Sequence, residues 1–120
     1  MRTLSVKERI KCEILHFCDG DTVYCLVACP CCGIHRPLYI RIKGIESAEP
    51  RGDTKAEASL IAYKWTKLYA NTKAELILTQ VSSDRYGRGI GDIYIDGRAL
   101  SAMLVESGDS WYQDHITKRR

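Results

Sequence analysis

The sequence predicts an α+β domain that is mainly β, with five strands and two or three helices. Short runs of alternating apolar and polar residues recur along the chain, and turns rich in Gly and Asp separate them. Two further stretches have the wider apolar spacing of a helix. The chain has 120 residues, of which 45% are hydrophobic and 28% charged. This size and composition predict one domain over residues 1–120, with its core at about 9–112 and a basic tail at 113–120.

The first half of the chain is expected to form a three-stranded meander. The turn at Asp19-Gly20-Asp21 separates its first two strands. The segment CPCCGIHRP at 29–37 is rich in turn formers, which predicts a hairpin with a long tip, and Gly44 ends the third strand. The expected strands are residues 9–17, 22–28 and 38–45.

The second half is expected to add a helix, two strands and a short helix. The helix begins at Thr54, where Thr54 and Glu57 match a capping box, and continues to about Ala70. Its expected buried stripe is Leu60, Ile61, Trp65 and Leu68. Strands at 75–81 and 88–95 and a helix at 99–107 follow. Three strands, a helix, two strands and a helix are the order of a five-stranded, OB-fold-like barrel.

Net charge, hydropathy and cysteine content limit the partners and the location that we expect for this protein. The net charge of +3 is compatible with a polyanionic partner. No run approaches the roughly 20 apolar residues of a membrane span, and the N-terminus lacks a signal-peptide pattern. We therefore expect a cytoplasmic monomer with no membrane partner, whose six cysteines are thiols or metal ligands rather than disulfides.

Three stretches place charged side chains beside turns. Asp19-Gly20-Asp21 offers carboxylates to a hard cation, RIKGIESAE at 41–49 combines an arginine with acids at a strand end, and DRYGRG at 84–89 holds an arginine that could bind a phosphate. Taken singly, each stretch also fits an ordinary polar turn, which is the favoured interpretation of Asp19-Gly20-Asp21 alone.

Taken together, these stretches resemble the staphylococcal nuclease family. The matching segments are CDGDTV (18–23), RIKGIESAE (41–49), KAEAS (55–59), DRYGRGIGDIYIDGRAL (84–100) and LVESG (104–108). The resemblance implies an OB-fold-like barrel that hydrolyses DNA and RNA with low sequence preference, usually with Ca²⁺, and leaves 5′-hydroxyl and 3′-phosphate ends. Mg²⁺ and Mn²⁺ are the alternative ions.

The resemblance also implies roles for particular residues. The metal would be held by Asp21, Glu46 and the backbone carbonyl of Ser47, with Asp19 in the outer shell. The catalytic residues would be Arg41 and Arg88, which bind the scissile phosphate, and Glu49 as general base. Glu46 stands where the family usually has Asp, and Ala48 where it has Pro; both departures bear on the activity rather than on the fold.

Contacts to nucleic acid are expected from Tyr86, Arg85 and Tyr112. Tyr86 is the best candidate to stack on a base. Trp111 and Tyr112 resemble an aromatic pair of many bacterial members, and packing of the C-terminal segment on the barrel explains them equally well.

The cysteine-rich tip could hold a structural Zn²⁺. Its candidate ligands are Cys25, Cys29, Cys32 and His35, and Cys29 and Cys32 have the C-x₂-C spacing. A reduced thiol loop remains as an alternative, as does a Cys29–Cys32 disulfide that forms only under oxidation.

The sequence thus predicts a metal-dependent endonuclease that acts on DNA, RNA or both. The alternative is a catalytically weak or inactive barrel of the same fold that binds nucleic acid or protein.

Overall fold

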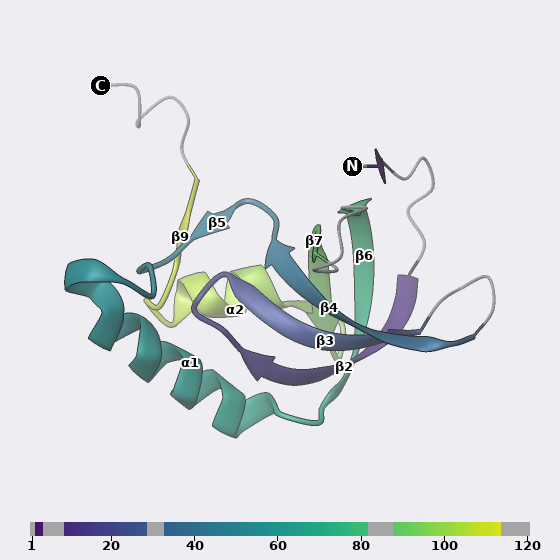
Figure 1. Ribbon diagram of the computed structural model, residues 1–120, viewed down its shortest axis with the longest axis horizontal. Coiled ribbons are helices and arrows are strands. Elements are labelled where there is room, and N and C mark those ends of the chain that lie inside the picture. Colours follow the sequence, from purple (N-terminus) through teal and green to yellow (C-terminus); the bar gives the residue numbers. More distant parts are fainter. Residues whose placement is uncertain (1, 4–8, 29–32, 82–87, 114–120) are drawn as a thin grey trace.

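A closed five-stranded barrel with two α-helices forms the protein, which confirms the predicted class (Figure 1). The computed structural model describes residues 2–3, 9–28, 33–81 and 88–113. The strands are β1 (Arg2–Thr3), β2 (Arg9–Phe17), β3 (Thr22–Ala28), β4 (His35–Ile42), β5 (Ile45–Glu46), β6 (Lys73–Val81), β7 (Arg88–Ile95), β8 (Arg98–Ala99) and β9 (Trp111–Tyr112). The helices are the 3₁₀ turn η1 (Gly52–Thr54), α1 (Lys55–Tyr69) and α2 (Leu100–Glu106).

The barrel closes because β6 pairs with both β2 and β7. Its strands follow the order β6, β2, β3, β4 and β7, and the β6–β7 pairing joins the two ends. All these pairs are antiparallel except β4 with β7, which are parallel. The segment from 43 to 87, with α1 and β6, makes the long connection that a parallel pair requires.

Alternation along each strand separates an apolar interior from a polar outer face. In β3, for example, Val23, Cys25 and Val27 are buried while the residues between them are partly exposed. The interior is filled mainly by branched aliphatic side chains from all five barrel strands. Ile14, Ile40, Ile42, Leu76 and Ile93 are fully buried.

The buried stripe of α1 is narrower than the sequence indicated. Ala58, Ile61 and Trp65 face the barrel, whereas Leu60 and Leu68 are 70% and 62% exposed, so their predicted burial is wrong. The helix packs mainly on β2, where Trp65 lies against Phe17 with ring centroids 5.8 Å apart. One neighbouring strand can cover only a narrow face of a helix.

The predicted capping box is also wrong. The hydroxyl of Thr54 donates to the carbonyl of Glu49 at 2.7 Å and makes no cap on α1. The 3₁₀ turn before α1 explains this, because Thr54 ends that turn with φ −101° and ψ 9° instead of the extended backbone of a capping residue.

The C-terminal half follows the predicted turns. Asp96 and Gly97 both have positive φ values, 51° and 80°, as a two-residue hairpin turn requires, and Gly108 ends α2 with φ 86°. Beyond it, β9 pairs with β5 in a small second sheet.

In the part of the chain that the structure describes, no helix is long and apolar enough to cross a membrane.

Barrel closure depends on a close approach of β6 to β7 at Gly91, which pairs with Leu78. A Cβ atom at Gly91 would collide with the carbonyl oxygen of Ile77 and lie 3.1 Å from the Cα of Leu78. At Gly89 the nearest obstacle, at 2.9 Å, is the mobile end of the Leu78 side chain.

We therefore expect Gly91→Ala to lower the free energy of unfolding by about 3 kcal/mol, because backbone must move, and Gly89→Ala by about 1 kcal/mol. Urea unfolding of both variants measures the difference. Equal losses would contradict a backbone collision at Gly91.

Candidate active site

The site begins at the turn between β2 and β3. The N–H of Cys18 donates to the carbonyl of Thr22 at 2.8 Å, and the N–H of Asp21 donates to Oδ1 of Asp19 at 3.0 Å. Both aspartates are nearly buried, with 8% and 9% of their surface exposed. This turn therefore brings two carboxylates to one end of the barrel.

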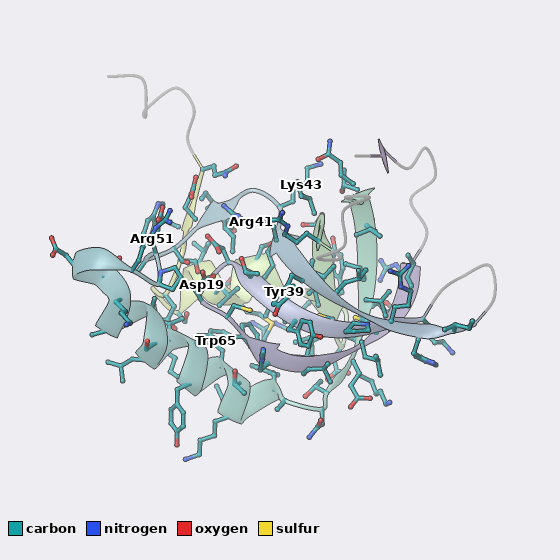
Figure 2. All side chains as sticks on the ribbon, in the orientation of Figure 1. Asp19, Tyr39, Arg41, Lys43, Arg51 and Trp65 are labelled. Atoms are coloured by element: carbon teal, nitrogen blue, oxygen red, sulfur yellow. The ribbon has the colours of Figure 1, made fainter. Side chains whose placement is uncertain are left out.

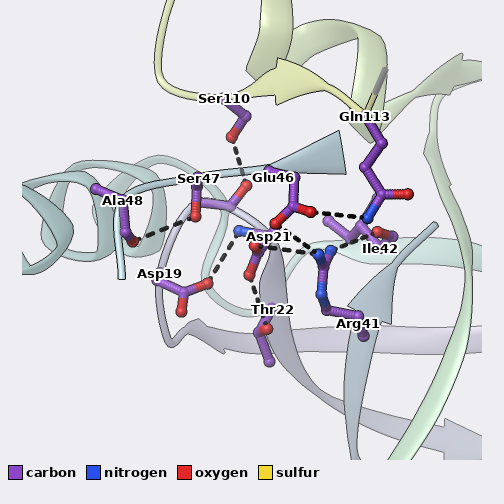
Figure 3. Close-up of polar contacts among 11 residues, drawn as sticks. Asp19, Asp21, Thr22, Arg41, Ile42, Glu46, Ser47, Ala48, Ser110 and Gln113 are labelled. Carbon is purple, nitrogen blue, oxygen red and sulfur yellow. Dashed lines mark hydrogen bonds and ion pairs between the residues drawn. The ribbon is translucent and has the colours of Figure 1, made fainter. Parts of the chain in front are cut away.

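Gly20 lets this turn pack directly against two other segments. A Cβ atom there would lie 2.7 Å from the Cβ of Ser47 and 2.8 Å from Oγ of Ser110. The hydroxyl of Ser110 also donates to the carbonyl of Gly20 at 2.6 Å. The turn, the segment after β5 and the segment after α2 are thereby held in contact (Figure 3).

Arg41 lies between two of the predicted metal-ligating carboxylates. Its Nη2 atom is 3.5 Å from Oδ2 of Asp21 and 3.4 Å from Oε1 of Glu46 (Figure 3). Its Nη1 atom donates to the carbonyl of Ile42 at 2.9 Å, which fixes the guanidinium close to β4. Asp21 and Glu46, far apart in the sequence, therefore share one positive charge.

The acidic turn perturbs the protonation of Asp21. The pKa of this carboxyl is raised to about 7; burial is the largest cause, and the hydrogen bond and charge of the neighbouring Asp19 contribute to the rise. Arg41 and the hydroxyl of Thr22, which donates to Oδ1 of Asp21 at 3.0 Å, oppose the rise. Asp21 is thus a carboxyl whose charge is costly until a cation compensates it.

Glu46 is oriented by a residue that the sequence analysis did not identify. The side-chain amide of Gln113 donates to Oε2 of Glu46 at 3.1 Å, and the N–H of Gln113 donates to the carbonyl of Gly44 at 2.9 Å. These contacts follow from the pairing of β5 with β9. Gln113 and Ser110 have no local sequence signal, because only the tertiary pairing of β9 brings them to the site.

Asp109 fixes the segment that carries Ser110. One oxygen of its carboxylate accepts from the indole N–H of Trp65 at 2.7 Å and lies 2.6 Å from Nζ of Lys64. The same oxygen accepts from the hydroxyl of Ser107 at 3.1 Å. The segment after α2 is thereby tied to α1 as well as to the acidic turn.

Arg88 lies on the same outer face of the barrel as Arg41. In the parallel pairing of β4 with β7, Arg41 is opposite Ile90, and Arg88 precedes Ile90 by two residues. Residues two apart in a strand point to the same face and lie about 7 Å apart. The two arginines predicted to bind phosphate are therefore on one face of adjacent strands.

Glu49, the predicted general base, pairs with Arg51 and, within the described residues, makes no hydrogen bond or ion pair with Asp21 or Arg41. Its side chain is 64% exposed and its carboxylate pairs with Nε of Arg51 at 3.0 Å.

The nucleic-acid and zinc predictions are only partly covered by the structure. Tyr86, Arg85, Cys29 and Cys32 lie outside the described residues, so their roles remain predictions. Tyr112 is in β9 and is 57% exposed.

The placement of Cys25 does not match its predicted place in the tip. It lies in β3 with no exposed surface, and its pKa is raised, first by a hydrogen bond with Cys12 and then by burial. Alternation in β3 points this side chain into the core, whereas the other described candidate, His35, is exposed at the start of β4.

The donor set of the site suits a hard divalent cation. Within the described ranges, no three His, Cys, Asp or Glu side chains form a ready-made metal centre. The carboxylates of Asp21 and Glu46 are nonetheless the kind of oxygen ligand that Ca²⁺ takes, and they already converge on one cation, the guanidinium of Arg41.

Comparison with known proteins identifies the relatives of this chain. Residues 39–120 match the family model described as staphylococcal nuclease homologue. A probable staphylococcal-like nuclease, CAN1, of Oryza sativa subsp. japonica is 36% identical over 85 residues, which cover 67% of this chain and 23% of that protein. The staphylococcal-like nuclease CAN1 of Arabidopsis thaliana is 30% identical over 84 residues, 70% of this chain and 24% of the relative. The chain thus spans about a quarter of the length of these relatives.

The raised pKa of Asp21 predicts a pH-dependent stability in the absence of divalent ions. The folded protein holds the proton up to about pH 7, whereas the unfolded chain loses it near the ordinary value of 3.8. The proton on Asp21 therefore stabilises the folded state relative to the unfolded chain. This stabilisation is full below pH 3.8 and is lost as the pH rises through 7.

With EDTA present, we expect Asp21→Asn to gain stability relative to the wild type between pH 5 and pH 8, by more than about 1 kcal/mol. Urea unfolding at both pH values measures this gain, with the exposed Asp53→Asn as the matched control. A constant difference between Asp21→Asn and the wild type would contradict the burial of a costly charge.

Proposed function

Because the chain belongs to the staphylococcal nuclease family, we propose that it is a metal-dependent endonuclease that hydrolyses phosphodiester bonds in DNA and RNA. The observation that carries this proposal is the shared position of Arg41 between Asp21 and Glu46, with Arg88 on the same face. Two cations beside paired carboxylates suit an anionic diester better than a neutral ligand.

Hydrolysis of a phosphodiester builds negative charge on the phosphoryl oxygens. Arg41 and Arg88, on one face of adjacent strands, are the proposed donors to these oxygens and would stabilise that charge where it develops. Asp21, Glu46 and the carbonyl of Ser47 would hold Ca²⁺, with Asp19 in its outer shell. A bound Ca²⁺ supplies further stabilisation of charge on the phosphoryl group.

The proposed reaction leaves a 5′-hydroxyl and a 3′-phosphate. The oxygen of water bonds to phosphorus, the bond from phosphorus to the 5′ oxygen breaks, and the 5′ oxygen takes up a proton from solvent water. Glu49 is the proposed acceptor of the proton from water. It would have to leave Arg51, and the exposure of both side chains makes that exchange inexpensive, since surface ion pairs contribute about 0–1 kcal/mol.

A binding module without cleavage is the competing function. The observation that favours it is the position of Glu49, which pairs with Arg51 rather than facing Asp21. Cleavage of single-stranded DNA with Ca²⁺, Mg²⁺ or Mn²⁺, and its loss with EDTA, separates the two functions.

Arg41→Ala should lower the rate of single-stranded DNA cleavage by at least about a hundredfold, because it removes a donor to the developing charge. Arg88→Ala is expected to do the same. Arg98→Ala is the matched control: this arginine is exposed in β8, pairs with Glu106 and should leave the rate unchanged.

Glu49→Gln should also reduce cleavage strongly, with Glu57→Gln in α1 as its control. Cleavage by Glu49→Gln at the wild-type rate would remove Glu49 from the mechanism. If no divalent ion supports cleavage by the wild type, the nuclease proposal fails and the binding module takes its place.

A further inference from the structure

Three aromatic side chains form a continuous row across the outer face of the barrel. His16 in β2 is the register partner of Tyr24 in β3, and Tyr24 is the register partner of Tyr39 in β4. The ring centroids of His16 and Tyr24 are 5.1 Å apart, and those of Tyr24 and Tyr39 are 4.6 Å apart. We call His16, Tyr24 and Tyr39 the aromatic row.

The exposure of the row increases toward β4. His16 and Tyr24 are partly buried, and the buried Nε2 atom of His16 has no hydrogen-bond partner among the described residues. Tyr39, at the other end, is 39% exposed. Cross-strand packing therefore accounts for His16 and Tyr24, whereas Tyr39 keeps open ring surface beside them.

At its β4 end, the aromatic row lies beside Arg41 and Arg88, the two arginines that we propose to bind phosphate. Tyr39 is the register partner of Arg88 in β7, and it precedes Arg41 by two residues on the same face of β4. Tyr39 and Arg41 project from β4, with Arg41 nearer the end of the strand that carries the acidic site (Figure 2). Their separation along the strand is about 7 Å, a distance that one nucleotide can span from phosphate to base.

Tyr24 and His16 restrict the movement of Tyr39. The tilted contact with Tyr24, at an interplanar angle of 40°, supports Tyr39 from the side of β3, and the stacked pair of His16 and Tyr24 extends this support to β2. A ring held in this way loses little side-chain entropy when a base stacks on it.

We propose that Tyr39, supported by the other two rings of the aromatic row, stacks on the base of the nucleotide next to the scissile phosphate. This inference rests on the proposed function for the phosphate site. An unpaired base can turn an open face to Tyr39, whereas the bases of a duplex are already stacked on each other. Lys43, exposed in the turn that follows β4, adds positive charge for the backbone of the same nucleic-acid strand.

Binding of a fluorescent oligothymidylate in EDTA, followed by anisotropy, tests this proposal without cleavage. Tyr39→Thr keeps a β-branched residue in the strand but removes the ring. We expect it to weaken binding about 5- to 100-fold, as base–aromatic stacking contributes about 1–3 kcal/mol. Tyr39→Phe should bind like the wild type.

Tyr63→Ala is the matched control, because Tyr63 is 67% exposed on α1 and belongs to no part of the site. Binding of a duplex of the same length should change less than twofold in Tyr39→Thr. Thermal unfolding followed by circular dichroism establishes that each variant is folded.

If Tyr39→Thr and Tyr63→Ala bind the oligothymidylate equally well, the inference about Tyr39 is wrong. A wild-type protein that cleaves DNA but has no measurable affinity for the single strand would also overturn it, while the nuclease proposal would stand. Conversely, loss of binding in Tyr39→Thr together with no cleavage by the wild type under any divalent ion would support the stacking role and reject the nuclease.

Discussion

The guanidinium of Arg41 organises the candidate site, because it is the cation that Asp21 and Glu46 share. Without it, two carboxylates on different segments would face each other at one end of the barrel, beside a third acid in Asp19. Burial, and after it the neighbouring Asp19, makes the charge of Asp21 costly, and the raised pKa of Asp21 reflects that cost. A divalent cation would offset that cost more fully and leave Arg41 able to bind an anionic diester.

The barrel positions these groups through contacts between segments distant in sequence. Trp65 of α1 donates to Asp109, and the neighbouring Ser110 donates to Gly20 in the acidic turn. The last described strand, β9, pairs with β5 and places Gln113 on Glu46. The segment after α2 therefore connects α1 to the site. Substitutions in this segment should alter the positions of the Asp21 and Glu46 carboxylates as well as the stability of the protein.

Periodicity in the sequence was sufficient to predict the barrel, and motif order was sufficient to predict the family. Alternation through the strand at Leu38–Ile42 correctly placed Tyr39 and Arg41 on one face. It could not reveal the contacts of Ser110 and Gln113, because these depend on which strand pairs with β9. Leu60 and Leu68 were assigned to the core because helical spacing alone does not show how much of a helix its neighbour covers. The aromatic row likewise depends on the register of three strands, including the irregularity in β2 between Ile14 and His16.

Calorimetric titration of Ca²⁺ into the wild type, Asp21→Asn and Arg41→Gln measures the shared-charge arrangement most directly. If Arg41 and Ca²⁺ use the same two carboxylates, the wild type binds one ion, Asp21→Asn binds it at least about tenfold more weakly, and Arg41→Gln binds it more tightly because a competing positive charge is gone. Equal Ca²⁺ affinity in all three proteins would show that Asp21 and Glu46 do not form the metal site.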